Sequence, residues 1–161
     1  MISARSPIQY IRAGKSHVGL LVDSRIDFLT EFWGMQDHAL ELELRAELTR
    51  FFEEEIPAKT YIAWLAFDGE RFAGVGGMKI YRRPGSFRSP DGWTAYIMNM
   101  YTPPEYRRRG IASQLLDKLI RSGKEQGVSF FELHATASGE PVYAKAGFTK
   151  HAEPAYRKLV L

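Results

Sequence analysis

The segment Met98–Ser113 combines a strand end, two prolines, three arginines and a glycine in an order that suits an anion-binding site. Pro103 and Pro104 end a β-rich stretch, because proline cannot donate to a sheet ladder. The arginines lead directly into a helical pattern that begins near Gly110. The first turn of a helix has unpaired backbone N–H groups at the positive end of its dipole. The pattern predicts a phosphate site there, and a basic helix start that only faces solvent is the alternative.

Two other glycine patterns favour no such site. The tripeptide Gly14-Lys15-Ser16 is similar to the end of a phosphate loop, but Gln9 stands where that motif needs its first glycine. The run Gly74–Gly77 falls inside an expected strand, where a bulge or a close backbone approach explains it better.

The hydrophobic periodicity predicts a chain in which strands and helices alternate. Strands are expected at Gln9–Ala13, Tyr61–Phe67, Arg71–Tyr81, Trp93–Thr102, Val128–Ala135 and Tyr156–Leu161. Helices are expected at His17–Trp33, Asp37–Glu55, Arg109–Gln126 and Glu140–Ala146. This order indicates an α/β domain with a mixed sheet of six or seven strands.

Two motifs resemble one known family. The segment Arg107–Ala112 (RRRGIA) resembles the Arg/Gln-x-x-Gly-x-Gly/Ala signature of the GNAT superfamily of acetyl-CoA-dependent N-acetyltransferases. Downstream, Tyr143–Phe148 (YAKAGF) is similar to the family's Tyr-x-x-x-Gly-Phe element. The resemblance implies a GNAT-like mixed sheet that is splayed between its fourth and fifth strands and flanked by about four helices. It also implies that residues 1–161 form a single domain.

The resemblance implies acetyl-CoA as cosubstrate, with its pantetheine arm on a strand edge and its pyrophosphate on the following loop. The residues that match these contacts are Met100, Tyr101, Thr102, Arg107, Arg108, Arg109, Gly110, Ile111, Ala112 and Ser113. The asparagine that the family often carries before its short helix is absent, and Ser138 is expected to replace its contact with the cofactor. No metal is expected.

The same resemblance places a catalytic tyrosine at Tyr143, whose hydroxyl is expected to protonate the departing sulfur. The alternative is that Tyr143 only packs against Phe148. The identity of the general base stays open. Glu132 and His134 alternate with apolar residues and so share one face of the expected strand. His134 is the first choice because a free imidazole titrates at about pH 6.5, and Glu132 and water are the alternatives.

We therefore expect direct acetyl transfer from acetyl-CoA to a primary amine of a small molecule or peptide. The seven acidic residues between positions 36 and 56 would attract a cationic amine, or else form a solvated face. Five aromatic residues would line an apolar acceptor pocket, although core positions are the more usual outcome. They are Phe32, Trp33, Phe51, Phe52 and Trp93.

Composition narrows these expectations. The chain of 161 residues has no cysteine, which excludes disulfides and thiolate sites, and its net charge of +3 argues only weakly for nucleic acid. It has no apolar run of membrane length, so a cytoplasmic protein without a membrane partner is expected. A CoA-ester sensor and a tRNA-directed, toxin-like acetyltransferase stay open as alternatives. A homodimer also stays open, because dimers are common among relatives.

Overall fold

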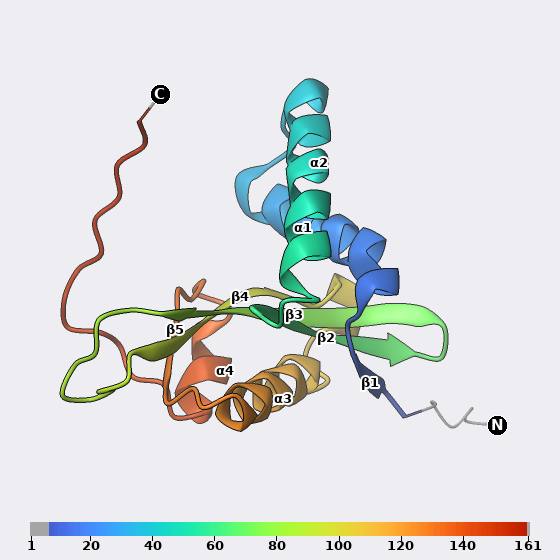
Figure 1. Cartoon of the computed structure of the whole chain (residues 1–161). Coiled ribbons are helices and arrows are strands. Elements are labelled where there is room, and N and C mark those ends of the chain that lie inside the picture. The colour runs from blue at the N-terminus through green and yellow to red at the C-terminus, as the bar shows by residue number, and fades with distance from the viewer. Residues whose placement is uncertain (1–6, 161) are drawn as a thin grey trace.

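Five strands pair in sequence order to form one sheet, which carries helices on both faces (Figure 1). The computed structural model describes residues 7–160. The strands are β1 (Gln9–Arg12), β2 (Tyr61–Asp68), β3 (Arg71–Arg82), β4 (Trp93–Tyr101) and β5 (Phe130–Leu133). The helices are α1 (Val18–Trp33), α2 (His38–Glu55), α3 (Ile111–Glu125) and α4 (Glu140–Lys145), with short 3-10 turns at Lys15–His17 and Pro104–Tyr106. Helices α1 and α2 cover one face, while α3 and α4 cover the other (Figure 1).

The central strands are apolar on both faces because both faces are covered. Strands β1 to β4 are antiparallel to their neighbours, and β5 runs parallel to β4. On the α1–α2 face, Leu21 packs with Tyr61 and Leu65. On the α3–α4 face, Met78 and Leu119 belong to a second cluster. This two-sided burial explains why β2 and β3 lack a simple alternation of polar and apolar residues.

The glycines of β3 allow close approaches of side chains to the sheet. A side chain at Gly77 would overlap the hydroxyl group of Tyr61, and one at Gly76 would crowd the sulfur of Met100. The expected close approach at Gly74–Gly77 is confirmed, since these positions leave room for neighbouring side chains.

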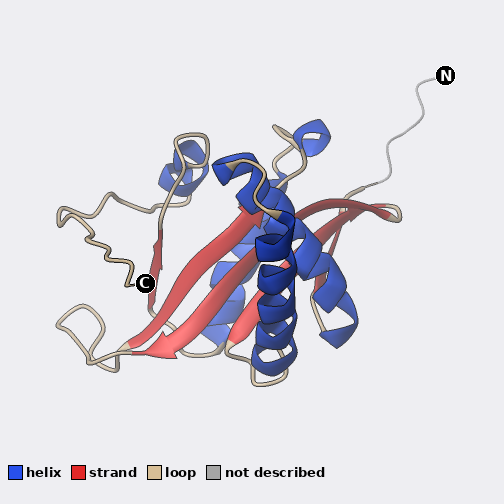
Figure 2. Cartoon of the chain, turned by 90° about the horizontal axis from the view of Figure 1, so that it is seen from above, coloured by secondary structure: helices blue, strands red, loops and turns tan. Residues whose placement is uncertain are grey.

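The sheet opens between its fourth and fifth strands, as expected. The parallel pairs run from Thr94 opposite Phe130 to Ile97 opposite Leu133, after which β4 continues to Tyr101 beside β3 but without β5. Figure 2 shows this divergence from above. Against β3, the same part of β4 is bulged, because two of its residues, 99 and 100, oppose one residue of β3. Bulges bend a strand and increase its twist, so the bulge helps β4 to leave its neighbour.

The expected count of six or seven strands is wrong, because the described sheet has five. The expected strand Tyr156–Leu161 accounts for the difference: residues 156–160 are extended but pair with no strand, and Leu161 lies outside the described residues. The segment runs away from the sheet and is exposed (Figure 1). Its side chains favour a strand, yet a strand needs a partner, and this tail does not lie along β5. Within residues 7–160, no helix is long and apolar enough to cross a membrane.

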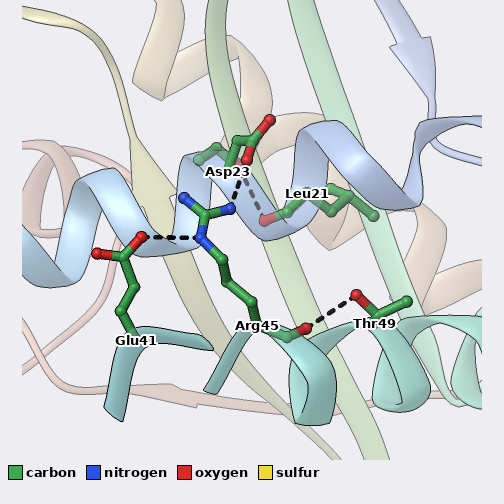
Figure 3. Close-up of polar contacts among 6 residues, drawn as sticks. Leu21, Asp23, Glu41, Arg45 and Thr49 are labelled. Atoms are coloured by element: carbon green, nitrogen blue, oxygen red, sulfur yellow. Dashed lines mark hydrogen bonds and ion pairs between the residues drawn. The ribbon is translucent and has the colours of Figure 1, made fainter. Parts of the chain in front are cut away.

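Helix α2 is held to α1 through one guanidinium group (Figure 3). Arg45 of α2 contacts Asp23 of α1 at 2.7 Å and Glu41 of its own helix at 2.8 Å. Asp37 caps the start of α2, as expected, because its carboxylate accepts hydrogen bonds from the first-turn backbone amides. The cap and the ion pairs fix where α2 begins and how it lies against α1.

Candidate functional site

The loop between β4 and α3 ends in an open helix start. Gly110 is the N-cap of α3 and adopts a left-handed conformation, with φ of +76°. No side chain caps this helix, and a Cβ placed at Gly110 would meet nothing within 4 Å. The first-turn amides of α3 therefore have no intrahelical partner and face open space at the positive end of the dipole. This is the geometry of an anion-binding helix start.

The three arginines before Gly110 have different partners. The guanidinium group of Arg107 contacts the carboxylate of Glu31 at 2.6 Å, which ties the loop to α1. That of Arg109 lies 3.8 Å from the carboxylate of Asp68. Arg108 is exposed and forms no ion pair with any residue from 7 to 160. The side chains of Arg107 and Arg109 thus hold the loop, and that of Arg108 is free to meet a ligand.

The strand edge expected to contact the cofactor borders the opening of the sheet. Met100 and Tyr101 belong to the part of β4 that continues past β5, and Thr102 follows directly. Unpaired backbone groups on a strand edge can pair with an extended partner. The helix start at Ile111, Ala112 and Ser113 lies at the other end of the same connection.

His134 follows the last residue of β5 and is hydrogen-bonded to a tyrosine of β4. Its Nδ1 lies 2.5 Å from the hydroxyl oxygen of Tyr96. The rings approach because Tyr96 stands opposite Glu132 in the parallel pair, two residues before His134. Sequence reasoning missed this role of Tyr96, since only the register of β4 and β5 brings the two side chains together. The pair stands beside the opening of the sheet.

Glu132 has partners that restrict it. Its carboxylate accepts a hydrogen bond from the hydroxyl of Tyr81 and lies 3.9 Å from the guanidinium group of Arg83. Burial and the hydrogen bond to Glu132 raise the pKa of Tyr81 to about 12. His134, by contrast, is exposed, and its Nε2 has no hydrogen bond within the described part of the chain. Of the two side chains expected as the base, His134 is the accessible one.

Tyr143 lies in α4, partly buried against the α3–α4 core. Its ring centroid is 6.1 Å from that of Phe148, so the expected packing contact is present. Burial raises the pKa of Tyr143, and nearby Tyr96 raises it further. Ser138 lies apart, in the turn before α4, where its hydroxyl is 3.2 Å from that of Thr136.

The acidic residues of the α2 region are largely occupied. Asp37 caps α2, while three of the glutamates form ion pairs, namely Glu41, Glu47 and Glu55. The other three are exposed and form no ion pair among residues 7–160: Glu43, Glu53 and Glu54. No group of three or more His, Asp or Glu side chains in that range could hold a metal ion.

The expectation that most of the five aromatics belong to the core is wrong. Only Phe52 is fully buried, while Phe51 is partly buried against the same cluster. Phe32, Trp33 and Trp93 are exposed. The reason for the first two is that the α1–α2 hairpin rises away from the sheet (Figure 1), so the end of α1 has nothing to pack against except α2.

Comparison with known proteins identifies the family. The acetyltransferase (GNAT) family profile matches residues 23–148, so the chain belongs to this family. No curated protein has a significant sequence match to this chain.

Solved structures share the fold. A predicted acetyltransferase from Clostridium acetobutylicum, solved with acetyl-CoA, is 28% identical with a TM-score of 0.85, over 94% of this chain and 96% of that one. A GCN5-related N-acetyltransferase from Ralstonia eutropha JMP134 is 22% identical with a TM-score of 0.82, over 94% and 99%. The aminoglycoside N-acetyltransferase AAC(6')-Iy, solved with CoA, is 17% identical with a TM-score of 0.73, over 98% and 99%.

The contact between Glu132 and Tyr81 leads to a measurable pKa change. In Glu132→Gln, we expect the pKa of Tyr81 to fall from about 12 but to stay above 10.0, because the burial persists while the negative charge is gone. Titration of the tyrosine Cζ signals by ¹³C NMR measures this shift. Glu140→Gln, which removes an exposed carboxylate on α4, should leave Tyr81 unchanged. An unaltered Tyr81 pKa in Glu132→Gln would contradict the described contact.

Proposed function

We propose that this protein transfers an acetyl group from acetyl-CoA to a primary amine of a small molecule or peptide. The observation that carries the proposal is the open start of α3, where Gly110 leaves the first-turn amides accessible beside a strand edge that has left its neighbour. Membership of the acetyltransferase family supports the same reaction class.

The residues around the start of α3 fit the chemistry of acetyl-CoA. A diphosphate needs hydrogen-bond donors and positive charge, which the amides of residues 108–113 and the side chain of Arg108 supply. An extended amide-bearing arm needs a free strand edge, which Met100–Thr102 offers. Ser138 is proposed only as a contact from the turn before α4. The bound cosubstrate would supply an acetyl thioester, an activated acyl donor.

His134 is proposed as the general base that takes a proton from the acceptor amine. When its Nδ1 carries the proton, it donates to the Tyr96 oxygen, and Nε2 keeps a lone pair for the amine. Once His134 is doubly protonated, Tyr96 still accepts from Nδ1, so the contact orients the ring in both states. Glu132 is the weaker candidate because Tyr81 and Arg83 already engage it.

Tyr143 is proposed as the general acid, a role that needs a hydroxyl protonated at neutral pH. Burial first, and then Tyr96, raises the pKa of Tyr143, which favours the protonated hydroxyl. The proton passes to the sulfur as the carbon–sulfur bond breaks, while the amine nitrogen forms the new bond to the acetyl carbon. The base takes one proton and the acid gives one, so the charges balance.

We further propose that residues 1–161 act as one domain and that the protein works in the cytoplasm. These two statements, like the open alternative of a homodimer, rest on the sequence and the family.

Gly110→Glu tests the anion site. The added carboxylate would stand in front of the first-turn amides, so we expect acetyl-CoA affinity, measured by calorimetry, to fall by about 100-fold or more. Gly110→Ala is the matched control: it carries the same left-handed strain of about 1–2 kcal/mol without the charge, and it should retain most of the affinity. Equal melting temperatures of the two variants would show that the loss is local. Unchanged affinity in Gly110→Glu would overturn the placement.

Tyr143→Phe tests the general acid. The substitution keeps the ring on Phe148, so the fold and the dissociation constant for acetyl-CoA should not change. We expect kcat to fall by about 100-fold or more, because a positioned general acid contributes at least that much. Release of free CoA with a panel of amines measures it. Binding of acetyl-CoA with no turnover in either protein would instead favour the CoA-ester sensor.

His134→Gln separates a histidine base from water. Glutamine can still contact Tyr96 but cannot take up a proton at neutral pH, so we expect a fall in kcat of about 100-fold at unchanged acetyl-CoA affinity. Glu132→Gln is the comparison, with a change of no more than about threefold. A rate in His134→Gln equal to that of the unmodified protein would mean that the proton leaves to water.

A further inference from the structure

A small pocket lies on the α1–α2 face, under the bulged part of β4. Its volume is about 160 Å³. Its apolar walls come from three residues of α2 and one of β4, namely Leu48, Phe51, Phe52 and Met98. A cavity of about 150 Å³ is large enough for a benzene molecule. The pocket therefore accepts a group of about six heavy atoms.

The β4 wall of this pocket holds a polar side chain without a partner. Asn99 occupies the bulge in a left-handed conformation, with φ of +56°, and is only 3% exposed. Among residues 7–160, neither its Oδ1 nor its Nδ2 has a hydrogen bond of good geometry, and the hydroxyl group of Tyr61, which also lines the pocket, lies beside it. Burial of an amide whose donor and acceptor groups are unmet is unfavourable. The amide atoms have almost no accessible surface, so Asn99 pairs with a polar ligand in the pocket only when its side chain turns toward the cavity.

The wall of the pocket that α1 forms supplies a positive charge. Arg25 is half-buried, and none of the ion pairs within the described part of the chain includes it. Its Cζ atom lies 5.5 Å from the ring centroid of Phe28, an aromatic contact that leaves the donor hydrogens of the guanidinium group unused. A partly buried guanidinium group without a carboxylate is unusual, and its flat fork matches a carboxylate in two parallel hydrogen bonds.

The pocket lies on the face of β4 that carries Tyr96, because Met98 lines the pocket and follows Tyr96 by two residues on that strand. Tyr61 lines it, and burial raises the pKa of Tyr61 to about 12, so the hydroxyl stays protonated. The positive charge of Arg25 acts on Tyr61 and also on Tyr96, the partner of His134.

We propose that Arg25 and Asn99 bind a carboxylate of the acceptor, which makes the acceptor a small amino acid rather than a simple amine or a polycation. The inference rests on the proposed function and adds the class of substrate. The pocket holds the carboxylate and about three or four carbon atoms, with the alkyl part against Leu48, Phe51 and Met98. The amine then lies toward His134.

The charges of this face agree with an anionic group better than with a cationic one. A polycation in the pocket would meet Arg25 at close range. The three unpaired glutamates of α2 do not line the pocket and are exposed to solvent. They therefore contribute little to binding inside it.

A binding experiment tests the pocket without turnover. The probes are 3-methylbutanoate and 3-methyl-1-butanol, which differ mainly in the carboxylate, and saturation-transfer NMR measures their affinities. We expect only the acid to bind, and to bind at least tenfold more weakly to Arg25→Gln. Asn99→Asp keeps the size and tolerates a left-handed φ, and its added negative charge should abolish binding. Arg50→Gln is the matched control, because Arg50 is exposed on α2 and pairs only with Glu47.

Equal binding of the two probes, or unchanged affinity in Arg25→Gln with an unchanged melting temperature, would overturn the inference. Measurements of acetyl transfer distinguish a failure of this inference from a failure of the proposed function. Amino acids such as leucine should be acetylated with a lower KM than the amines that lack the carboxylate, and Arg25→Gln should raise that KM at constant acetyl-CoA affinity. Transfer only to amines without a carboxylate would refute the pocket but keep the acetyltransferase. A protein that binds 3-methylbutanoate but not acetyl-CoA would refute the acetyltransferase, and with it the acceptor role of the bound molecule, but would keep the carboxylate site.

Discussion

The parting of β4 from β5 is the constraint on which the rest of this protein depends. Four parallel pairs hold the two strands together, and the bulge at residues 99 and 100 then turns β4 away. Backbone groups that would be paired in a closed sheet are left at an edge. The opening joins the two faces, so groups carried by α1 and α2 can act on the same point as groups carried by α3 and α4.

The two faces supply different chemistry. On one side of the connection after β4, backbone amides and a left-handed glycine create a site with little dependence on side chains. On the other side, the chemistry depends on particular side chains, namely Tyr96 with His134 and Arg25 with Asn99. A family can keep the first and vary the second, which is consistent with a shared fold at identities of 17 to 28% among the structures compared.

The sequence was sufficient to predict most elements, because their signals are local. The helical stripe of α3, the hairpin at Asp68 and Gly69 and the cap at Asp37 each lie within a few residues. The predictions that failed or were missed needed distant partners. Residues 156–160 favour a strand but run away from the free edge of β5. Contacts such as Arg107 with Glu31, or Tyr96 with His134, depend on register and packing that no local pattern encodes.

The attachment of α2 has a consequence for motion. Only Phe52 of this helix is fully buried, and the guanidinium group that ties it to α1 is partly in water, where such pairs contribute about 0–1 kcal/mol. Segments with few buried contacts open locally at a small fraction of the global unfolding free energy. The C-terminal end of α2 is held more firmly, because Phe52 is buried against Tyr61 and Glu55 pairs with Lys79 of β3. Local opening is therefore expected to begin at the N-terminal half of the helix, while its last turn stays on the sheet.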